Sequence, residues 1–366
     1  MTRVSAENPG SLLRPAWLLD LRQRERDGVA TEDEARAGED RAILEAIRLQ
    51  ESLGLDVITD GEMRRTSWIG TARGSVDGFE PRPGGPGWQW HGTAQAAELS
   101  RRPFPFVVRP IGVRYSLARH EYDFLRRHTR ARTKFCVPAP SYHRTVWHPE
   151  HSREAYPRCD DFLVAMRDVI RDMVREAAAM GCDYVQLDAP NYGNLCDRDL
   201  RAAMAASGRD LEAELEVDIV LDNSVLEGLA GVTTAMHICR GNAAGNWAGS
   251  GGYELIAEQL FAGLAFDRLL LEYDTPRSGG FEALRQVRPD ATVVLGLLTT
   301  KSGDLEDAAA VEARIREAAR IVPLERLALS PQCGFASVEW GNPITPSEQQ
   351  AKLRLVVDLA RRIWPS

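Results

Sequence analysis

A regular alternation of short apolar runs with longer amphipathic stretches constrains the fold of this chain more than any other feature. Runs rich in β-branched residues predict strands, and helical periodicity between them predicts helices. The seven expected strands are DVIT (56–59), KFCVPA (134–139), YVQLD (184–188), TAMHIC (234–239), LLLEY (269–273), TVVLGLL (292–298) and LALS (327–330). A weaker run, RVSAE (3–7), can supply an eighth strand.

Helical patterns separate these strands. The expected helices cover residues 31–53, 160–180, 212–229, 253–264, 305–321 and 346–363. Eight strands alternating with helices favour an α/β fold of the (β/α)8 or TIM barrel type, formed by residues 1–366 as a single domain. A doubly wound sheet is the alternative, but the phosphate-binding pattern Gly-x-Gly-x-x-Gly does not follow the first strand.

Residues 70–133 interrupt the alternation after the second strand. PRPGGPGW (81–88) is rich in turn formers, and FPFVVRPIGVRY (104–115) alternates as an antiparallel strand does. We therefore expect an insertion beside the barrel mouth.

Composition excludes several functional classes. The chain has 366 residues, of which 44% are hydrophobic and 27% charged, so a large core can form. A formal net charge of -8 argues against nucleic-acid binding. No run approaches the ~20 apolar residues of a membrane span, and the N-terminal segment lacks the pattern of a signal peptide. We expect a cytoplasmic protein whose six cysteines are reduced.

Two residues at the end of one strand suggest a metal site. His237 and Cys239 are two apart, so their side chains point to the same side of a strand. Glu272 ends the next strand and Cys333 follows the last, and barrel enzymes build their sites at this face. Two thiolates, an imidazole and a carboxylate suit Zn2+. A packed core His and Cys is the alternative for the H-x-C pair alone.

A zinc ion here would have a chemical use. A thiol bound to zinc is deprotonated at neutral pH, so the site could hold an alkyl acceptor as a thiolate nucleophile. Glu272 would then have to give way to the incoming sulfur. A closed site with all four ligands would be structural only.

Seven segments resemble one family. TAMHICRGN (234–242), LLLEYDTPRSGGFEALRQV (269–287) and LALSPQCGFAS (327–337) are similar to the zinc-binding segments of the cobalamin-independent methionine synthases. GSLLRP (10–15), GLDVITDGEMRR (54–65), VPAPSYHR (137–144) and YVQLDAP (184–190) follow the family's order. The chain resembles the short form, which corresponds to the C-terminal barrel. The superfamily also includes coenzyme M methyltransferases and an epoxide-opening zinc enzyme.

The resemblance assigns roles residue by residue. It implies four zinc ligands, which are His237, Cys239, Glu272 and Cys333, and it implies that Ser11, Glu62 and Asp188 hold the amino acid part of homocysteine. Carboxylates at strand ends suit an ammonium group. The alternative for Glu62 is an exposed loop carboxylate paired with Arg64 or Arg65, and the alternative for Asp188 is a turn-capping role before Pro190.

Two positions depart from the family pattern. Family members often have an acid where this chain has Ala189, and the full-length enzyme has a histidine where this chain has Thr299, Thr300 and Lys301. Lys301 is the candidate proton donor, provided that its pKa lies well below the ordinary value of about 10.4.

Histidines and tryptophans supply further candidates. His143, His148 and His151 lie within nine residues and could bind a cation, but the loop composition favours a substrate-facing role, with His143, Tyr142 or Trp147 lining the donor pocket. Trp88, Trp90 and Trp247 could stack on a pterin or pack the insertion.

The expected function is zinc-dependent methyl or alkyl transfer to a thiol. The first candidate is the cytoplasmic, cobalamin-independent reaction of methionine biosynthesis, in which 5-methyltetrahydrofolate methylates homocysteine. A zinc-dependent thiol transferase acting on another small electrophile, like the epoxyalkane:coenzyme M transferase, or a corrinoid-partner methyltransferase are the alternatives. A structural zinc site and a metal-free, decarboxylase-like barrel stay open as well. We expect small-molecule substrates, no nucleic-acid or membrane partner, and a possible homo-oligomer.

Overall fold

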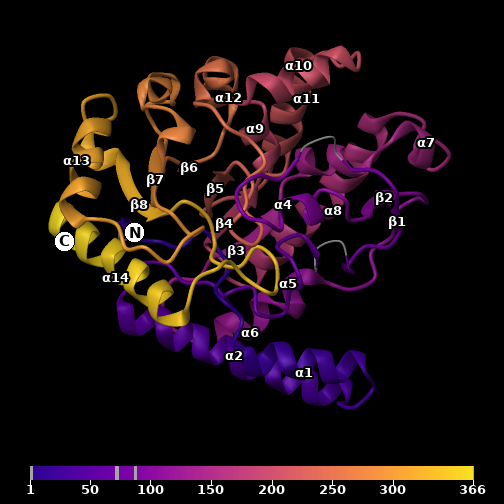
Figure 1. Cartoon of the computed structure of the whole chain (residues 1–366), viewed down its shortest axis with the longest axis horizontal. Coiled ribbons are helices and arrows are strands. Elements are labelled where there is room, and N and C mark those ends of the chain that lie inside the picture. Colours follow the sequence, from indigo (N-terminus) through magenta and orange to yellow (C-terminus); the bar gives the residue numbers. More distant parts are fainter. Residues whose placement is uncertain (1–2, 71–73, 86–88, 366) are drawn as a thin grey trace.

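A six-stranded parallel sheet forms the centre of the computed structural model, which describes residues 3–70, 74–85 and 89–365. The strands follow one another in the sheet in chain order, and helices lie around them (Figure 1). They are β3 (Phe135–Pro138), β4 (Tyr184–Asp188), β5 (Thr233–Ile238), β6 (Arg268–Glu272), β7 (Thr292–Leu298) and β8 (Leu327–Pro331). The chain is therefore an α/β protein, as expected.

Two short segments connect the edges of this sheet. Ala6 forms a parallel bridge with Leu329, Glu7 with Val57, and Ile58 with Thr133. These bridges lead from β8 through residues 6–7 and 57–58 back to the start of β3. Six strands and two bridged segments connected in this way form a closed barrel of eight parallel segments.

The first two expected strands are shorter than the sequence suggests, because side chains replace backbone partners. The carboxylate of Asp56 accepts the backbone N–H groups of Ser5 and Ala6, at 2.7 and 2.9 Å. The amide of Gln50, which comes from a helix, accepts the N–H of Thr59 at 3.0 Å. Each contact removes a donor from the ladder, so only bridges form.

Helices cover the outside of the sheet, and their starts follow local capping rules. Thr31 caps α2 in a capping box with Glu34, and Thr345 does the same for α14 with Glu348. Outside residues 70–133, the α-helices of the described chain are α1 (Ala16–Arg26), α2 (Glu32–Leu53), α7 (Pro149–Ser152), α8 (Cys159–Ala179), α9 (Pro190–Asn194), α10 (Arg198–Ala206), α11 (Leu211–Ser224), α12 (Ala257–Gly263), α13 (Ala308–Ala318) and α14 (Pro346–Ile363). The 3-10 helices are η1 (Pro140–Val146), η2 (Tyr253–Leu255), η3 (Pro276–Ser278), η4 (Glu282–Gln286) and η5 (Leu324–Arg326).

Three of the expected helices differ in extent from the structure. The helix expected over 212–229 ends at Ser224, and Gly228 beyond it has a φ of +79°, which a helix does not allow. The helix expected over 253–264 is divided between η2 and α12. The one expected over 305–321 is limited to α13. The expected helix 346–363 coincides with α14.

Residues 70–133 contain an antiparallel pair, as the alternation of 104–115 suggested. β1 (Phe79–Arg82) pairs with β2 (Phe104–Val107), and the same region contains the short helices α4 (Ala96–Leu99), α5 (Leu117–His120) and α6 (Tyr122–Arg127). An antiparallel bridge between His91 and Trp247 joins this region to the loop after β5. The region therefore contacts the face at which the strands end.

Side chains fill the inside of the ring. One buried cluster takes a residue from each of seven segments, namely Val4, Val57, Tyr184, Ala235, Leu270, Val294 and Ala328. Such a layer of side chains is typical of barrel interiors. Beside it, Glu7 forms buried ion pairs with Lys134 at 2.9 Å and Arg268 at 2.7 Å. The interior is therefore closed at this level, and the described helices include none long and apolar enough to cross a membrane.

Candidate metal centre and substrate pocket

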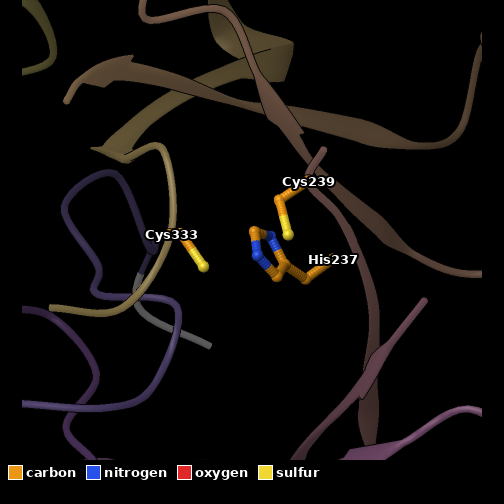
Figure 2. Close-up of side chains that lie close together, drawn as sticks. All are labelled: His237, Cys239 and Cys333. Carbon is orange, nitrogen blue, oxygen red and sulfur yellow. The ribbon is translucent and has the colours of Figure 1, made fainter. Parts of the chain in front are cut away.

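Three potential metal ligands meet where β5 and β8 end. His237 lies in β5, Cys239 follows it by two residues, and Cys333 lies just beyond β8. One ligand atom from each of them lies within 4.8 Å of the other two. Figure 2 shows the imidazole between the two sulfur atoms. The arrangement follows from the two-residue period of a strand and from the common edge at which parallel strands end.

The environment of this group fits a bound metal ion. His237 is only 4% exposed, and neither ring nitrogen has a hydrogen-bond partner among the described residues. A buried polar atom without a partner costs about 1–3 kcal/mol. Coordination to zinc would satisfy a ring nitrogen, and thiolate sulfur and imidazole nitrogen are donors that zinc prefers.

Electrostatics favour a thiolate at Cys333. Contact with the Cys239 sulfur lowers the pKa of Cys333 well below the ordinary thiol value, although burial opposes this, and His237 and Lys301 add to the lowering. Burial lowers the pKa of His237, but Cys333 and Asp188 outweigh it, so its pKa is raised. The same contact raises the pKa of Cys239 well above the ordinary thiol value, so the pair favours ionisation at Cys333.

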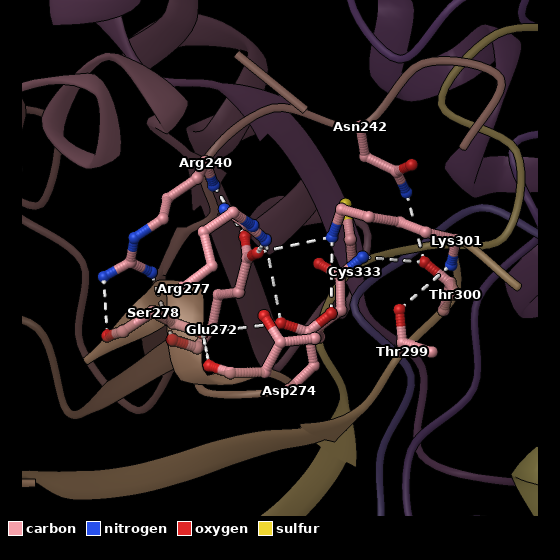
Figure 3. Close-up of polar contacts among 12 residues, drawn as sticks. Arg240, Asn242, Glu272, Asp274, Arg277, Ser278, Thr299, Thr300, Lys301 and Cys333 are labelled. Atoms are coloured by element: carbon pink, nitrogen blue, oxygen red, sulfur yellow. Dashed lines mark hydrogen bonds and ion pairs between the residues drawn. The ribbon is translucent and has the colours of Figure 1, made fainter. Parts of the chain in front are cut away.

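Glu272, the expected fourth ligand, has other partners (Figure 3). Its Oε1 lies 3.2 Å from Lys301 Nζ and forms an ion pair with Arg277, and its Oε2 accepts the backbone N–H of Arg240 at 2.7 Å. Among the described residues, the group of potential metal ligands contains His237, Cys239 and Cys333 and does not contain Glu272. Metal ligation by Glu272 stays a prediction.

Lys301 does not meet the condition set for a proton donor. Burial lowers its pKa, but the carboxylates of Asp274 and Glu272 outweigh this effect, so the pKa of Lys301 is raised. Its ammonium lies 3.4 Å from Asp274 Oδ2 as well as 3.2 Å from Glu272 Oε1. Lys301 is therefore an ion-pair partner in this structure, and its role as a proton donor stays a prediction.

A pocket opens directly onto the three potential ligands. The other side chains that line it include Ser11, Glu62, Trp68, Trp90, Tyr142, Asp188, Asn194, Asn242 and Ser337. The rings of Trp68 and Tyr142 meet edge to face, with centroids 4.6 Å apart. The pocket thus combines an aromatic wall, two carboxylates and the three ligands.

Glu62 is a buried carboxylate in an unusual backbone conformation. Its φ is +57°, which lies in a backbone region that residues other than glycine rarely adopt. Backbone strain of this kind concentrates at functional sites. Burial raises the pKa of Glu62 to about 8, although Arg65 and Arg14 oppose the rise. Oε1 lies 3.6 Å from Arg65, while Oε2 has no hydrogen-bond partner among the described residues. The alternative prediction was an exposed loop carboxylate at Glu62. It is wrong, because Glu62 is buried.

Asp188 and Ser11, the other two residues predicted to bind the amino acid part of homocysteine, also line the pocket. Burial raises the pKa of Asp188 to about 6, and its Oδ1 accepts a hydrogen bond from Gln186 at 2.7 Å. Ser11 Oγ accepts the backbone N–H of Ala336 at 3.3 Å. Ala189, where the family often has an acid, is fully buried. Ser11, Glu62 and Asp188 therefore share one pocket, and their binding roles stay predictions.

His143 lies elsewhere. It is fully buried in η1, and its Nδ1 is 3.1 Å from the carbonyl oxygen of Ala139. A second cavity lies next to the pocket, and Asn194 lines both. Trp147 and His148 line this second cavity. In the described part of the chain, His143 lines neither space. Its role in donor binding stays a prediction.

The remaining candidates divide between pocket and packing. Trp90 lines the pocket, whereas Trp247 stacks on His91 with centroids 4.7 Å apart, and Trp88 lies outside the described residues. His148, Glu150 and His151 form a second group of potential ligands, but it is less buried than the first.

Sequence reasoning missed several residues of the site. Trp68 follows the second segment of the ring without any periodic pattern, so only the folded chain shows that it reaches the pocket. Arg277 and Asp274 had a usable signal, because they lie five and two residues after Glu272 in one loop. Buried carboxylates need compensating charge, and an arginine in the same loop is a natural source of it.

Fold and site together define the class of protein as an α/β barrel with a buried group of two thiols and an imidazole, all potential metal ligands, at the carboxyl ends of its strands. The family model of the cobalamin-independent synthase catalytic domain matches residues 14–362. The chain belongs to this family.

Similar proteins support the assignment. The chain is 36% identical over 362 residues to "uncharacterized protein YxjH" of Bacillus subtilis strain 168, covering 98% of this chain and 94% of the relative. It is 23% identical over 328 residues to a methionine synthase of Pyrococcus horikoshii, covering 89% and 84%. The crystal structure of the putative vitamin-B12 independent methionine synthase from Listeria monocytogenes has a TM-score of 0.73 at 29% identity and covers both chains fully.

Proposed function

We propose that this chain transfers a methyl group to the sulfur of a thiol, with zinc as its metal, homocysteine as the acceptor and 5-methyltetrahydrofolate as the donor. The observation that carries the proposal is one pocket containing His237, Cys239 and Cys333 together with the buried carboxylates of Glu62 and Asp188. Metal ligands and ammonium-binding groups in one small space suit a thiol that carries an amino group. We further propose that residues 1–366 form one domain and that 70–133 is an insertion in it.

The residues would divide the work as follows. His237, Cys239 and Cys333 would hold the zinc ion, and Glu62, Asp188 and Ser11 would bind the amino acid part of the acceptor. When bound, zinc lowers the pKa of a thiol and keeps it as a nucleophilic thiolate at neutral pH. Two carboxylates with raised pKa values gain a partner when an ammonium group binds, which favours their charged forms.

The aromatic wall would orient the methyl donor. Trp68, Trp90 and Tyr142 line the pocket beside the ligands, and flat rings are bound well by such side chains. The second cavity next to Asn194 offers further space for an extended donor. Holding donor carbon and acceptor sulfur in contact removes much of the entropic barrier to transfer.

A thiol transferase acting on another small electrophile is the second candidate. It is favoured by Ala189, which replaces an acid, and by Lys301, which stands where the full-length enzymes have a histidine and is held in ion pairs. This candidate uses the same metal centre with a different donor.

The test is the detection of methionine by mass spectrometry. Zinc-loaded protein is incubated with homocysteine and 5-methyltetrahydrofolate, in mono- and triglutamate forms, without cobalamin. Repeated turnover that Cys239→Ser abolishes and Cys182→Ser retains would support the proposal, since Cys182 is a buried thiol whose Sγ lies 3.2 Å from the Tyr184 carbonyl. Zinc and thiol binding without methionine formation would reject the folate donor and favour the second candidate.

A further inference from the structure

The buried guanidinium of Arg65 lies between two carboxylates. One belongs to Glu62, which lines the pocket, and the other belongs to Glu121, which lies between α5 and α6 in the region 70–133. The side chain of Arg65 is 2% exposed, and those of Glu62 and Glu121 are 5% and 2% exposed. Two buried carboxylates therefore compete for one buried cation.

Glu121 has the closer contacts with this cation. Arg65 Nε lies 3.1 and 3.2 Å from the two oxygens of Glu121, and Nη2 donates to Oε2 at 2.7 Å. Such a two-point contact between a guanidinium and a carboxylate is strong and well oriented. Glu62 Oε1 lies 3.6 Å from Arg65 Nη1, which is too far for a hydrogen bond. Arg65 is therefore directed to Glu121.

The other N–H groups of Arg65 are bound as well. Nη2 also donates to the carbonyl of Cys136 at 2.6 Å, and Nη1 donates to the carbonyl of Trp68 at 3.0 Å. A guanidinium has five N–H groups, so a single one on Nη1 is left without an acceptor in these contacts. A closer approach of Arg65 to Glu62 would lengthen the contacts with Glu121.

Both carboxylates are positioned by contacts that do not involve the Arg65 side chain. Arg14 Nη2 donates to the carbonyl of Glu62 at 2.6 Å and to the carbonyl of Arg65 at 3.0 Å, which fixes the backbone of this loop. Glu121 directly precedes Tyr122, which is buried in the hydrophobic core. The Arg65 side chain is therefore the part of this group that can move from one carboxylate to the other.

We propose that Glu121 holds Arg65 away from Glu62 and so keeps Glu62 available for the ammonium group of the substrate. The inference rests on the proposed function, in which Glu62 binds the amino acid part of the acceptor. If Arg65 paired closely with Glu62, its positive charge would repel an ammonium group at the same carboxylate. Glu121 and Arg65 are then positioning residues, and the region 70–133 contributes to specificity for acceptors that carry an amino group.

The test compares two thiols that differ only in the amino group, homocysteine and 4-mercaptobutanoate. Their affinities for zinc-loaded protein are measured by calorimetry without methyl donor. Glu121→Gln keeps the shape of the side chain but removes its charge, so the buried Arg65 should move to Glu62. We expect homocysteine to bind about tenfold more weakly and 4-mercaptobutanoate to change by less than about twofold. In a Glu62→Gln background, Glu121→Gln should have no further effect on homocysteine.

Two more variants separate this effect from a general disturbance. Asp123→Asn is the matched control, because Asp123 is a carboxylate of α6 that pairs with Arg126 at 2.7 Å, and both thiols should bind to it as to the wild type. The double variant Arg65→Met, Glu121→Gln removes both charges, and apolar side chains often replace a buried ion pair without loss of stability. It should keep the wild-type ratio of the two affinities, because no cation remains to bind Glu62.

Three results would overturn the inference. Glu121→Gln could weaken both thiols equally or neither, or the double variant could lose the preference for homocysteine. If Glu121→Gln does not fold, the double variant decides. A wild type that prefers homocysteine, together with any of these results, overturns the inference and leaves the proposed acceptor intact. A wild type that binds both thiols equally contradicts the proposed acceptor and this inference together.

Discussion

Asp188 on β4 lies directly beside His237 on β5, because the parallel register pairs these two residues. Neighbouring strands are roughly 4.8 Å apart, so a carboxylate and an imidazole that is a potential metal ligand face the pocket side by side. A small molecule with both an amino group and a thiol can therefore contact both at once. This relationship predicts that Asp188 recognises the amino group and not the sulfur.

The variant Asp188→Asn should weaken homocysteine binding by about 10- to 100-fold, since hydrogen bonds to charged groups contribute about 1.5–3 kcal/mol. Binding of 4-mercaptobutanoate, which lacks the amino group, should change little. Both affinities are measured by calorimetry on zinc-loaded protein, with the exposed Asp199→Asn as control. Equal losses for the two thiols would contradict a role in amino-group recognition.

Metal content provides an independent prediction. Cys239→Ser and Cys333→Ser should each lower zinc affinity at least tenfold. Even the removal of a residue that only hydrogen-bonds to a metal ligand lowers metal affinity by about 10- to 100-fold. Zinc per chain is measured by mass spectrometry after competition with a chelator. Cys182→Ser, a buried thiol outside the group, should keep its zinc. Full zinc content in both ligand variants would exclude the site.

The ligand group was predictable from sequence because it depends on regular structure. The spacing of His237 and Cys239 places both on one side of a strand, and the ends of parallel strands meet at one edge, which brings Cys333 close. Most of the expected strands are present for the same reason. The two shortest segments of the ring differ because Asp56 and Gln50 take over backbone hydrogen bonds, and such tertiary contacts leave no periodic signal.

The partners of each side chain were less predictable than its position. Glu272 ends β6 as expected, but its carboxylate contacts Lys301, which comes from beyond the neighbouring strand β7. His143 was expected to face a substrate, yet the 3-10 turn of η1 brings its ring to the carbonyl of Ala139. Strand order and turn type decide these contacts, and local sequence patterns do not encode either of them directly.

The aromatic wall predicts an effect on the donor. Trp68→Leu should raise the KM for the methyl donor about 2- to 10-fold, because aromatic pairs contribute about 0.5–1.5 kcal/mol beyond buried area. The affinity for homocysteine should remain within about twofold, since Glu62 and Asp188 are unchanged. Steady-state kinetics with each substrate varied separates the two effects. Trp340→Leu is the matched control, because that ring is 46% exposed. If Trp68→Leu lowered the affinity for homocysteine alone, Trp68 would bind the acceptor and not the methyl donor.

Glu62 predicts a pH dependence with a definite sign. Its pKa in the folded chain is about 8, above the ordinary carboxyl value, so folding favours the protonated form. The stability that this group contributes is complete at low pH and is lost as the pH rises from about 4.5 towards 8. Without ligand, Glu62→Gln should therefore lose less stability than the wild type when the pH rises through this window. Thermal unfolding at several pH values measures the difference. The exposed Glu216→Gln should behave as the wild type.

The same group predicts proton release on binding. At pH 7 most of the Glu62 carboxyl is protonated, and an ammonium group beside it favours ionisation. Homocysteine should therefore release up to about one proton more from the wild type than from Glu62→Gln, whereas 4-mercaptobutanoate should release the same number from both. Calorimetry in two buffers with different ionisation enthalpies counts these protons. If homocysteine released equal numbers from both proteins, Glu62 would not be the group that meets the ammonium, and Asp188 would carry that role alone.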